Sequence, residues 1–256
     1  MEQLHSLVLG EGEPMIILHG FLGMSDNWKT LGRHYAENGL QVHLVDQRNH
    51  GRSFHSDTFN YDVLSDDLYR YMREKGLSKA IIMGHSMGGK TAMQFACDHP
   101  EMTKKLIVAD IAPKFYPPHH NSILSALKAL DLAAIGSRKE AETALAEQIK
   151  EPGIRLFLLK NLYRAEKDRF ALRINLDVLG ERMNEVGENI GNTDIFEGPT
   201  LFIRGGNSEY IDTKDTPQIV RHFPLATVKT IPETGHWLHA ENPDAYFTIT
   251  KHFIES

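Results

Sequence analysis

Residues 84–88, with the sequence Gly-His-Ser-Met-Gly, constrain the fold of this chain more than any other stretch. They follow the apolar run 80–83 and precede the helix-like run 90–96. A strand, a Gly-x-Ser-x-Gly turn and a helix are typical of a nucleophile elbow, a strained turn that presents its serine at a helix N-terminus. The glycines remove side chains that would clash in so tight a turn. The pattern predicts a nucleophilic Ser86; the alternative is an ordinary glycine-rich turn.

Short apolar runs alternate with helix-like segments along most of the chain. Most of these runs are apolar throughout, which is typical of strands covered by helices on both faces. The helix-like segments 28–38 and 63–75 stop at Gly39 and Gly76, and glycine at that place is a helix stop signal. The alternation predicts an α/β protein, a mostly parallel central sheet flanked by helices. The strands are expected at 15–18, 42–45, 80–83, 106–109, 200–203 and 227–231.

The alternation breaks in the middle of the chain. Residues 122–189 are mainly helix-like and rich in Ala, Leu, Glu, Lys and Arg. A helical insertion between two strands would cover the carboxyl edge of the sheet, where open α/β sheets bind ligands. We therefore expect a helical cap, or lid; a helical subdomain that only adds stability is the alternative. The expected division is a core of residues 1–113 and 197–256 with a cap at 114–196, inserted after the sixth strand.

Composition narrows the class of protein. The 256 residues are 41% hydrophobic and 24% charged, as in a soluble globular domain. The net charge of −6 argues against nucleic-acid or membrane-surface partners. A lone cysteine, Cys97, fits a reducing compartment. We expect no signal peptide, because residues 1–6 lack a charged region followed by an apolar one. No apolar stretch approaches the roughly 18 residues of a membrane span. We expect a cytoplasmic protein; the sequence does not indicate its oligomeric state.

A serine nucleophile needs a base, and histidine is the usual one because its pKa lies near neutrality. The chain has 14 histidines, so position must choose among them. His236 follows the last expected strand and therefore opens at the same sheet edge as Ser86. Gly235 before it allows a tight approach, which favours His236 over its neighbour His239. We predict His236 as the base.

Acyl transfer also needs fixed donors for the oxyanion. The N–H group of the residue after the nucleophile, Met87, is the first. The second usually comes from an early loop after a strand, and residues 19–23 (His-Gly-Phe-Leu-Gly) fit that place. We predict the Phe21 N–H as this donor. The ring of His19 is expected to hold the loop by hydrogen bonds and not to act in the chemistry.

The order Ser, acid, His along the chain matches the α/β-hydrolases. The sequence resembles that superfamily over nearly its whole length and, more narrowly, the YbfF-type esterases and ABHD-eleven-like hydrolases. The resemblance implies a serine esterase or thioesterase with a helical cap and without a metal. The blocks that carry it are 19–23, 46–53, 84–89, 110–113, 205–208 and 235–237.

The acid departs from the common family pattern. Many α/β-hydrolases carry an Asp in the loop after the strand at 200–203, where this chain has Ser208. A hydroxyl cannot supply the negative charge that steadies an imidazolium, so Ser208 is expected to play only a supporting role. Asp110 ends the preceding strand at the same sheet edge, and the resemblance also points to it. We predict Asp110 as the acid; a strand-end cap is its alternative role. The competing carboxylates are Glu209, Asp212 and Asp177.

Two further expectations concern support and cofactors. Asp46 and Arg48 end another strand and are expected to form a charge-assisted pair beneath the site. The chain has no Walker-type phosphate loop, no Gly-x-Gly-x-x-Gly opening a helix after the first strand and no closed zinc spacing. We therefore expect neither a nucleotide cofactor nor a metal.

These residues together predict hydrolysis of a small-molecule ester or acyl thioester through an acyl-enzyme. Apolar side chains are expected to wall the substrate pocket. Carbon–carbon bond hydrolysis and cofactor-free perhydrolysis use the same triad and stay open, as does a ligand-binding, receptor-like protein. Ser86 argues against dehalogenases and epoxide hydrolases, which use an Asp nucleophile. The expected pocket residues are Leu22, Phe157, Leu158, Leu162, Phe170, Leu176 and Trp237.

Overall fold

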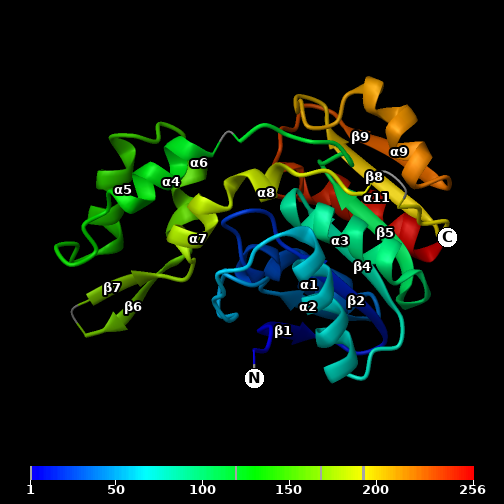
Figure 1. Cartoon of the computed structure of the whole chain (residues 1–256), viewed down its shortest axis with the longest axis horizontal. Helices are drawn as coiled ribbons and strands as arrows, with labels where there is room; N and C mark the ends of the chain where they lie inside the picture. Colours follow the sequence, from blue (N-terminus) through cyan, green and yellow to red (C-terminus); the bar gives the residue numbers. More distant parts are fainter. Residues whose placement is uncertain (1, 119, 168, 192–193) are drawn as a thin grey trace.

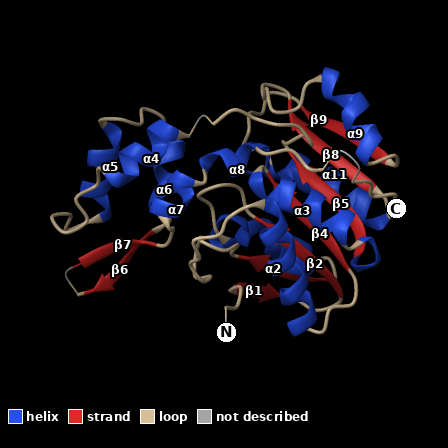
Figure 2. Cartoon of the chain, in the orientation of Figure 1, coloured by secondary structure: helices blue, strands red, loops and turns tan. Residues whose placement is uncertain are grey.

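A computed structural model describes residues 2–118, 120–167, 169–191 and 194–256. The described residues form a seven-stranded sheet with the strand order β1-β3-β2-β4-β5-β8-β9 (Figures 1 and 2). The first strand pairs antiparallel with β3, and every other pairing is parallel. The strands are β1 (Ser6–Leu9), β2 (Glu13–Leu18), β3 (Leu40–Val45), β4 (Ala80–His85), β5 (Thr103–Ala109), β8 (Thr200–Gly205) and β9 (Ala226–Ile231).

Helices cover both faces of the sheet, as the uniformly apolar strands predict. Neighbouring strand residues point to opposite faces. Ile16 and Ile82 join the core beneath the first group of helices, whereas Met15 and Ile81 join the core beneath the second. The first group is α2 (Tyr61–Glu74), α3 (Met87–Asp98) and α9 (Thr216–His222); the second is α1 (Lys29–Glu37), α10 (Leu238–Glu241) and α11 (Pro243–Glu255).

All six predicted strands are present, and both predicted glycine stops follow the helices α1 and α2 with positive φ values, +84° at Gly39 and +68° at Gly76. The edge strand β1 was not predicted. It has four residues and pairs with a single neighbour, so it lacks the continuous apolar run of a central strand.

The chain between β5 and β8, hereafter the insertion, leaves and re-enters the sheet between two neighbouring strands. It lies to one side of the sheet edge in Figure 1. Five strands precede it, so the expected position after the sixth strand is corrected to the fifth. Its elements are α4 (Asn121–Lys128), α5 (Arg138–Ala146), α6 (Pro152–Leu159), β6 (Leu162–Glu166), β7 (Arg169–Leu172), α7 (Leu176–Glu181) and α8 (Met183–Gly187).

The insertion is not purely helical as expected, because β6 and β7 form an antiparallel hairpin. The aromatic residues Tyr163 and Phe170 favour strands, and each ring also carries a guanidinium over its face. The insertion has a hydrophobic core of its own, which Phe21, Leu22 and Met87 of the sheet domain extend. The insertion therefore packs directly on the loops that surround Ser86. No helix among the described residues is long and apolar enough to cross a bilayer.

A buried lysine ties both ends of the insertion to α3. Lys90 is wholly buried, and its Nζ donates to the backbone carbonyls of Lys114 at 2.7 Å and Gly187 at 2.9 Å, and also to that of Glu188. Lys114 lies where the chain enters the insertion, and Gly187 ends α8 near its exit. The Tyr116 ring lies 4.9 Å from the ammonium. Burial lowers the pKa of Lys90 to about 7.

We predict that Lys90→Met destabilises the protein. The substitution nearly keeps the length of the side chain but removes the donor of the Lys114 and Glu188 carbonyls. The Gly187 carbonyl keeps the Tyr116 N–H. A buried acceptor left unpaired costs about 1–3 kcal/mol, so the free energy of unfolding should fall by about 2–5 kcal/mol. Urea unfolding followed by circular dichroism measures the change.

The matched control is Lys104→Met. Lys104 pairs with Glu13 at the surface, where the lysine side chain is 45% exposed, and such pairs contribute under about 1 kcal/mol. A loss in Lys90→Met no larger than in this control would contradict the assigned role.

Candidate active site

Ser86 occupies the turn between β4 and α3 with φ at +53°, in the left-handed region where a side chain is strained. The predicted glycine requirement is met. A Cβ on Gly84 would lie 2.0 Å from the Gly88 carbonyl oxygen, and one on Gly88 would lie 2.5 Å from that of His19. Backbone therefore packs on backbone on both sides of the serine. This packing holds Ser86 at the N-terminus of α3, as the motif predicts.

Asp110 and His236 meet at the same sheet edge. Asp110 follows β5 and is wholly buried, and its Oδ2 lies 2.8 Å from Nδ1 of His236, which follows β9. The same carboxylate accepts the Gly205 N–H at 3.0 Å and the Ser208 hydroxyl. Ser208, at the place where the common pattern has an Asp, thus contacts the Asp110 carboxylate directly.

The competing carboxylates lie elsewhere. Glu209 and Asp212 are exposed, and Asp212 caps the short 3-10 helix at Thr213–Asp215. Asp177 is 87% exposed and pairs with Lys128 on the insertion. The structure brings none of these three carboxylates to His236.

The contact with Asp110 decides the tautomer of a neutral His236. Nδ1 carries the hydrogen donated to the carboxylate, which leaves Nε2 as the acceptor nitrogen. Tyr210 stacks on the imidazole with ring centroids 3.8 Å apart, and the His85 ring lies 4.7 Å away on a tilted plane. His85 also hydrogen-bonds the His236 carbonyl at 2.8 Å. Within the described part of the chain the Ser86 hydroxyl makes no hydrogen bond, and Ser86 and His236 line the same cavity.

Two aromatic neighbours of the site were not predicted, Tyr210 and His85. The only sequence signals for them were their positions, next to Ser208 and inside the elbow. His239, the alternative base, stacks on Trp28 with ring centroids 4.2 Å apart. Burial lowers the pKa of His239 to about 3.

The loop at 19–23 approaches Ser86 closely. A Cβ on Gly20 would lie 3.3 Å from the Cβ of Ser86. The loop turns back on itself through a hydrogen bond from the Gly23 N–H to the Gly20 carbonyl at 2.9 Å, with Leu22 at φ +60°. Among the described residues, nothing accepts a hydrogen bond from the N–H of Phe21 or of Met87. The two N–H groups predicted as oxyanion donors therefore have no acceptor among the described residues.

Two buried histidines hold this loop. His19 Nδ1 bonds the Gly20 carbonyl at 2.9 Å while its Nε2 accepts the Gln47 N–H at 3.0 Å, which is the loop-holding geometry predicted for it. His50 was not predicted: its Nε2 accepts the Leu22 N–H at 3.2 Å and its Nδ1 bonds the Arg48 carbonyl. In both rings Nε2 must stay unprotonated to keep these contacts. Burial lowers the pKa of His19, and it lowers that of His50 to about 3.

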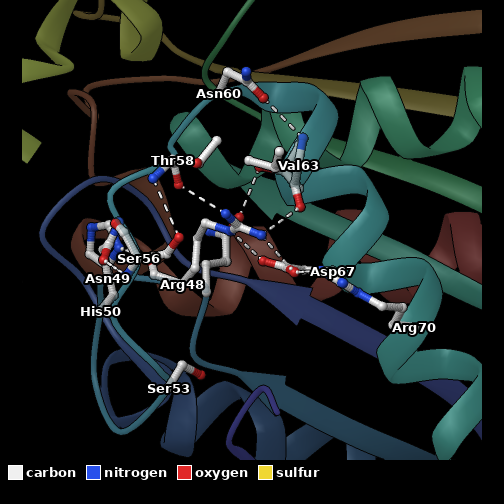
Figure 3. A network of polar contacts seen from close by, with 12 residues as sticks. Arg48, Asn49, His50, Ser53, Ser56, Thr58, Asn60, Val63, Asp67 and Arg70 are labelled. Carbon is white, nitrogen blue, oxygen red and sulfur yellow. Dashed lines mark hydrogen bonds and ion pairs between the residues drawn. The ribbon is translucent and has the colours of Figure 1, made fainter. Parts of the chain in front are cut away.

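The predicted pair of Asp46 and Arg48 does not form. The Arg48 guanidinium turns toward α2 and binds both oxygens of Asp67, at 2.5 and 2.9 Å, as well as the carbonyl oxygen of Thr58 (Figure 3). The bidentate fit to a buried carboxylate explains the choice. Asp46 instead accepts backbone N–H groups, including that of Ser25 at 2.6 Å. Both residues brace the loop after β3, each through another partner.

A cavity of about 500 Å³ lies between the sheet edge and the insertion. Four of the predicted pocket residues line it, together with both members of the Ser–His pair. Leu162 and Phe170 are buried within the core of the insertion and Leu176 packs against that core, so these three expected wall residues are corrected. The lining residues that matter here are Leu22, Ser86, Phe157, Leu158, His236 and Trp237.

No group of three or more His, Cys, Asp or Glu side chains is arranged to hold a metal ion in the part of the chain that the structure describes. The histidines near the site have other partners. His19 and His50 hydrogen-bond backbone groups, His236 contacts Asp110, and His239 stacks on Trp28.

Comparison with known proteins places the chain. A family model described as alpha/beta hydrolase fold matches residues 13–135. The chain is 36% identical over 247 residues to the sn-1-specific diacylglycerol lipase ABHD11 of Mus musculus, covering 94% of this chain and 80% of that protein. It is 32% identical over 244 residues to esterase YbfF of Escherichia coli, covering 94% and 92%. A solved structure described as a marine microorganism esterase is 42% identical, with a TM-score of 0.95 over 99% of this chain and 100% of that one.

The chain belongs to the α/β-hydrolase family. Within that family it is a serine hydrolase that acts on esters, in the subgroup that contains YbfF and ABHD11. The predicted fold and the predicted subgroup are both confirmed.

The buried histidines predict an acid-sensitive fold. Burial holds the pKa values of His19, His50, His85 and His239 below 6.5 in the folded protein. Below pH 6.5 the unfolded chain therefore binds more protons than the folded one, and stability falls as the pH falls. The free energy of unfolding, measured in urea at steps from pH 7.5 to 4.5, should decline throughout the range below 6.5.

His50→Gln supplies the control because a Gln oxygen can accept the Leu22 N–H without titrating. This variant should show a shallower decline, by up to about 1.4 kcal/mol per pH unit. A wild-type stability that stays constant from pH 7.5 to 5 would refute the expectation.

Proposed function

We propose that this hydrolase cleaves carboxylic esters and acyl thioesters through an acyl-enzyme on Ser86. The 2.8 Å contact between Asp110 and Nδ1 of His236 carries the proposal. It fixes the tautomer in which Nε2 accepts a proton, and His236 lines the same cavity as Ser86. Asp110 is the acid of this triad, and Ser208 holds its carboxylate.

In the first half of the reaction Nε2 of His236 takes the hydroxyl proton of Ser86 while Oγ attacks the carbonyl carbon. The negative charge that develops on the carbonyl oxygen is stabilised by the free N–H groups of Phe21 and Met87. Asp110 stabilises the imidazolium and does not itself take the proton. Collapse of the tetrahedral intermediate breaks the bond to the alcohol or thiol, which leaves with the proton from Nε2.

In the second half water replaces the leaving group. Nε2 removes a proton from the water as its oxygen attacks the acyl-enzyme, and the same two N–H groups hold the second oxyanion. The acid leaves when the bond to Oγ breaks, and Ser86 regains its proton from His236. No metal or redox group takes part in these steps.

Residues 114–196 serve as a cap over a core of residues 1–113 and 197–256. Phe157 of the cap and Trp237 of the core lie on the cavity wall with ring centroids 6.1 Å apart. With Leu22 and Leu158 they offer an apolar surface that suits an aliphatic acyl chain. The diacylglycerol lipase and esterase relatives support the same substrate class.

Ser86→Ala tests the nucleophile. The variant keeps the fold but has no atom to form the acyl-enzyme, so turnover of p-nitrophenyl butyrate should fall by about 10⁴-fold or more. Burst kinetics in the wild type, absent from the variant, would report the intermediate. Near wild-type turnover in Ser86→Ala would overturn the mechanism.

Asp110→Asn tests the acid. Loss of the negative charge beside Nδ1 and a disfavoured tautomer should lower kcat by about 10⁴-fold. Asp212→Asn and Glu209→Gln are the controls, because both side chains are exposed, and Asn at position 212 can still cap its helix. All three variants should keep the wild-type circular dichroism. A larger loss in either control than in Asp110→Asn would reverse the assignment.

A further inference from the structure

One side chain of the insertion donates a hydrogen bond to the loop at residues 19–23, hereafter the oxyanion loop. Asn161 lies between α6 and β6 and is wholly buried. Its Nδ2 donates to the Leu22 carbonyl at 2.8 Å. The backbone of Asn161 is itself fixed, since its N–H bonds the Leu158 carbonyl and its carbonyl accepts the Arg173 N–H, both at 3.0 Å. The backbone that carries the amide is therefore fixed, and the bond from Nδ2 to Leu22 orients the amide itself.

The three peptide groups from Gly20 to Gly23 are each held by a hydrogen bond. The Leu22 N–H bonds His50. The Gly20 carbonyl accepts both His19 Nδ1 and the Gly23 N–H. The Leu22 carbonyl accepts Asn161. A trans peptide points its N–H away from its carbonyl, so fixing the Gly20 carbonyl aims the Phe21 N–H in the opposite direction.

Asn161 affects the direction of the Phe21 N–H through two peptide groups. It holds the Leu22 carbonyl, and the same peptide group carries the Gly23 N–H that bonds the Gly20 carbonyl. The Gly20 carbonyl in turn belongs to the peptide group of the Phe21 N–H. Leu22 is in the left-handed region, which costs about 1–3 kcal/mol and persists only where neighbours hold it.

We propose that Asn161 is a positioning residue for the oxyanion hole, so that the insertion supplies part of the catalytic geometry as well as the pocket wall. This inference rests on the proposed function, since it requires Phe21 to be an oxyanion donor. A misdirected donor weakens binding of the tetrahedral transition state and leaves binding of the planar ester almost unchanged.

Asn161→Leu, of similar size, removes the donor. We expect kcat to fall by about 10- to 100-fold with KM within about twofold of wild type, since a loss of oxyanion geometry appears in the transition state. A trifluoromethyl ketone, which forms a tetrahedral oxyanion on the serine, should lose affinity by the same factor as kcat. Asn161→Ser, too short to reach Leu22, should show the same split and covers the case in which the Leu variant does not fold.

Asn175→Ala is the matched control. Asn175 also joins the insertion to a core loop, through Nδ2 to the Asn49 Oδ1 at 3.2 Å, but it does not touch residues 19–23. It should lose stability without losing kcat or affinity for the ketone. If the Asn161 variants keep kcat and ketone affinity, or raise KM alone, the proposal is wrong. Ser86→Ala assayed alongside separates the two claims: full activity there refutes the proposed function, whereas an inactive Ser86→Ala with active Asn161 variants refutes only this inference.

Discussion

A close backbone contact joins the elbow to the end of β2. Position 88 lies so near the carbonyl oxygens of Leu18 and His19 that only glycine fits there. This contact sets the depth of α3 against the sheet, and with it the position of Ser86 beside the 19–23 loop. Ser86 and Phe21, the proposed nucleophile and oxyanion donor, follow strands that are neighbours in the sheet but are 65 positions apart in sequence. Their juxtaposition follows from this single packing contact.

The Asp110 carboxylate shows that the acidic group can lie at the end of β5, although the common family pattern places it after β8. Strands β5 and β8 are neighbours, so a group at the end of either one lies within reach of the loop after β9. Here the charge lies on Asp110 and the hydroxyl of Ser208 binds it from the neighbouring strand end. The Gly205 N–H adds a third donor to the buried carboxylate. A buried charge is tolerable when such donors surround it, which explains why both positions must be polar.

The parts of the fold that were predicted from the sequence are those with a local signal. Buried parallel strands are apolar throughout, and the two helix stops carry glycines. Ser86 lies in a motif. The prediction of Asp110 as the acid rests on the hydroxyl at position 208, on the strand end that Asp110 occupies and on the family resemblance. The misses have the opposite character. Arg48 binds Asp67 on α2, and no spacing rule in the sequence favours Asp67 over Asp46 as its partner. The strands of the hairpin in the insertion are too short to show a period of two residues.

Asn161 is also invisible from sequence, because its partner is a backbone carbonyl 139 positions away. This contact shows that the insertion also holds a loop next to Ser86, in addition to lining the cavity. Lys90 binds the segments through which the chain enters and leaves the insertion. Asn175 binds the loop after β3, and Asn161 binds the loop at residues 19–23. A movement of the insertion as one body would break all of these contacts together, including the bond that holds the Leu22 carbonyl next to the proposed Phe21 donor.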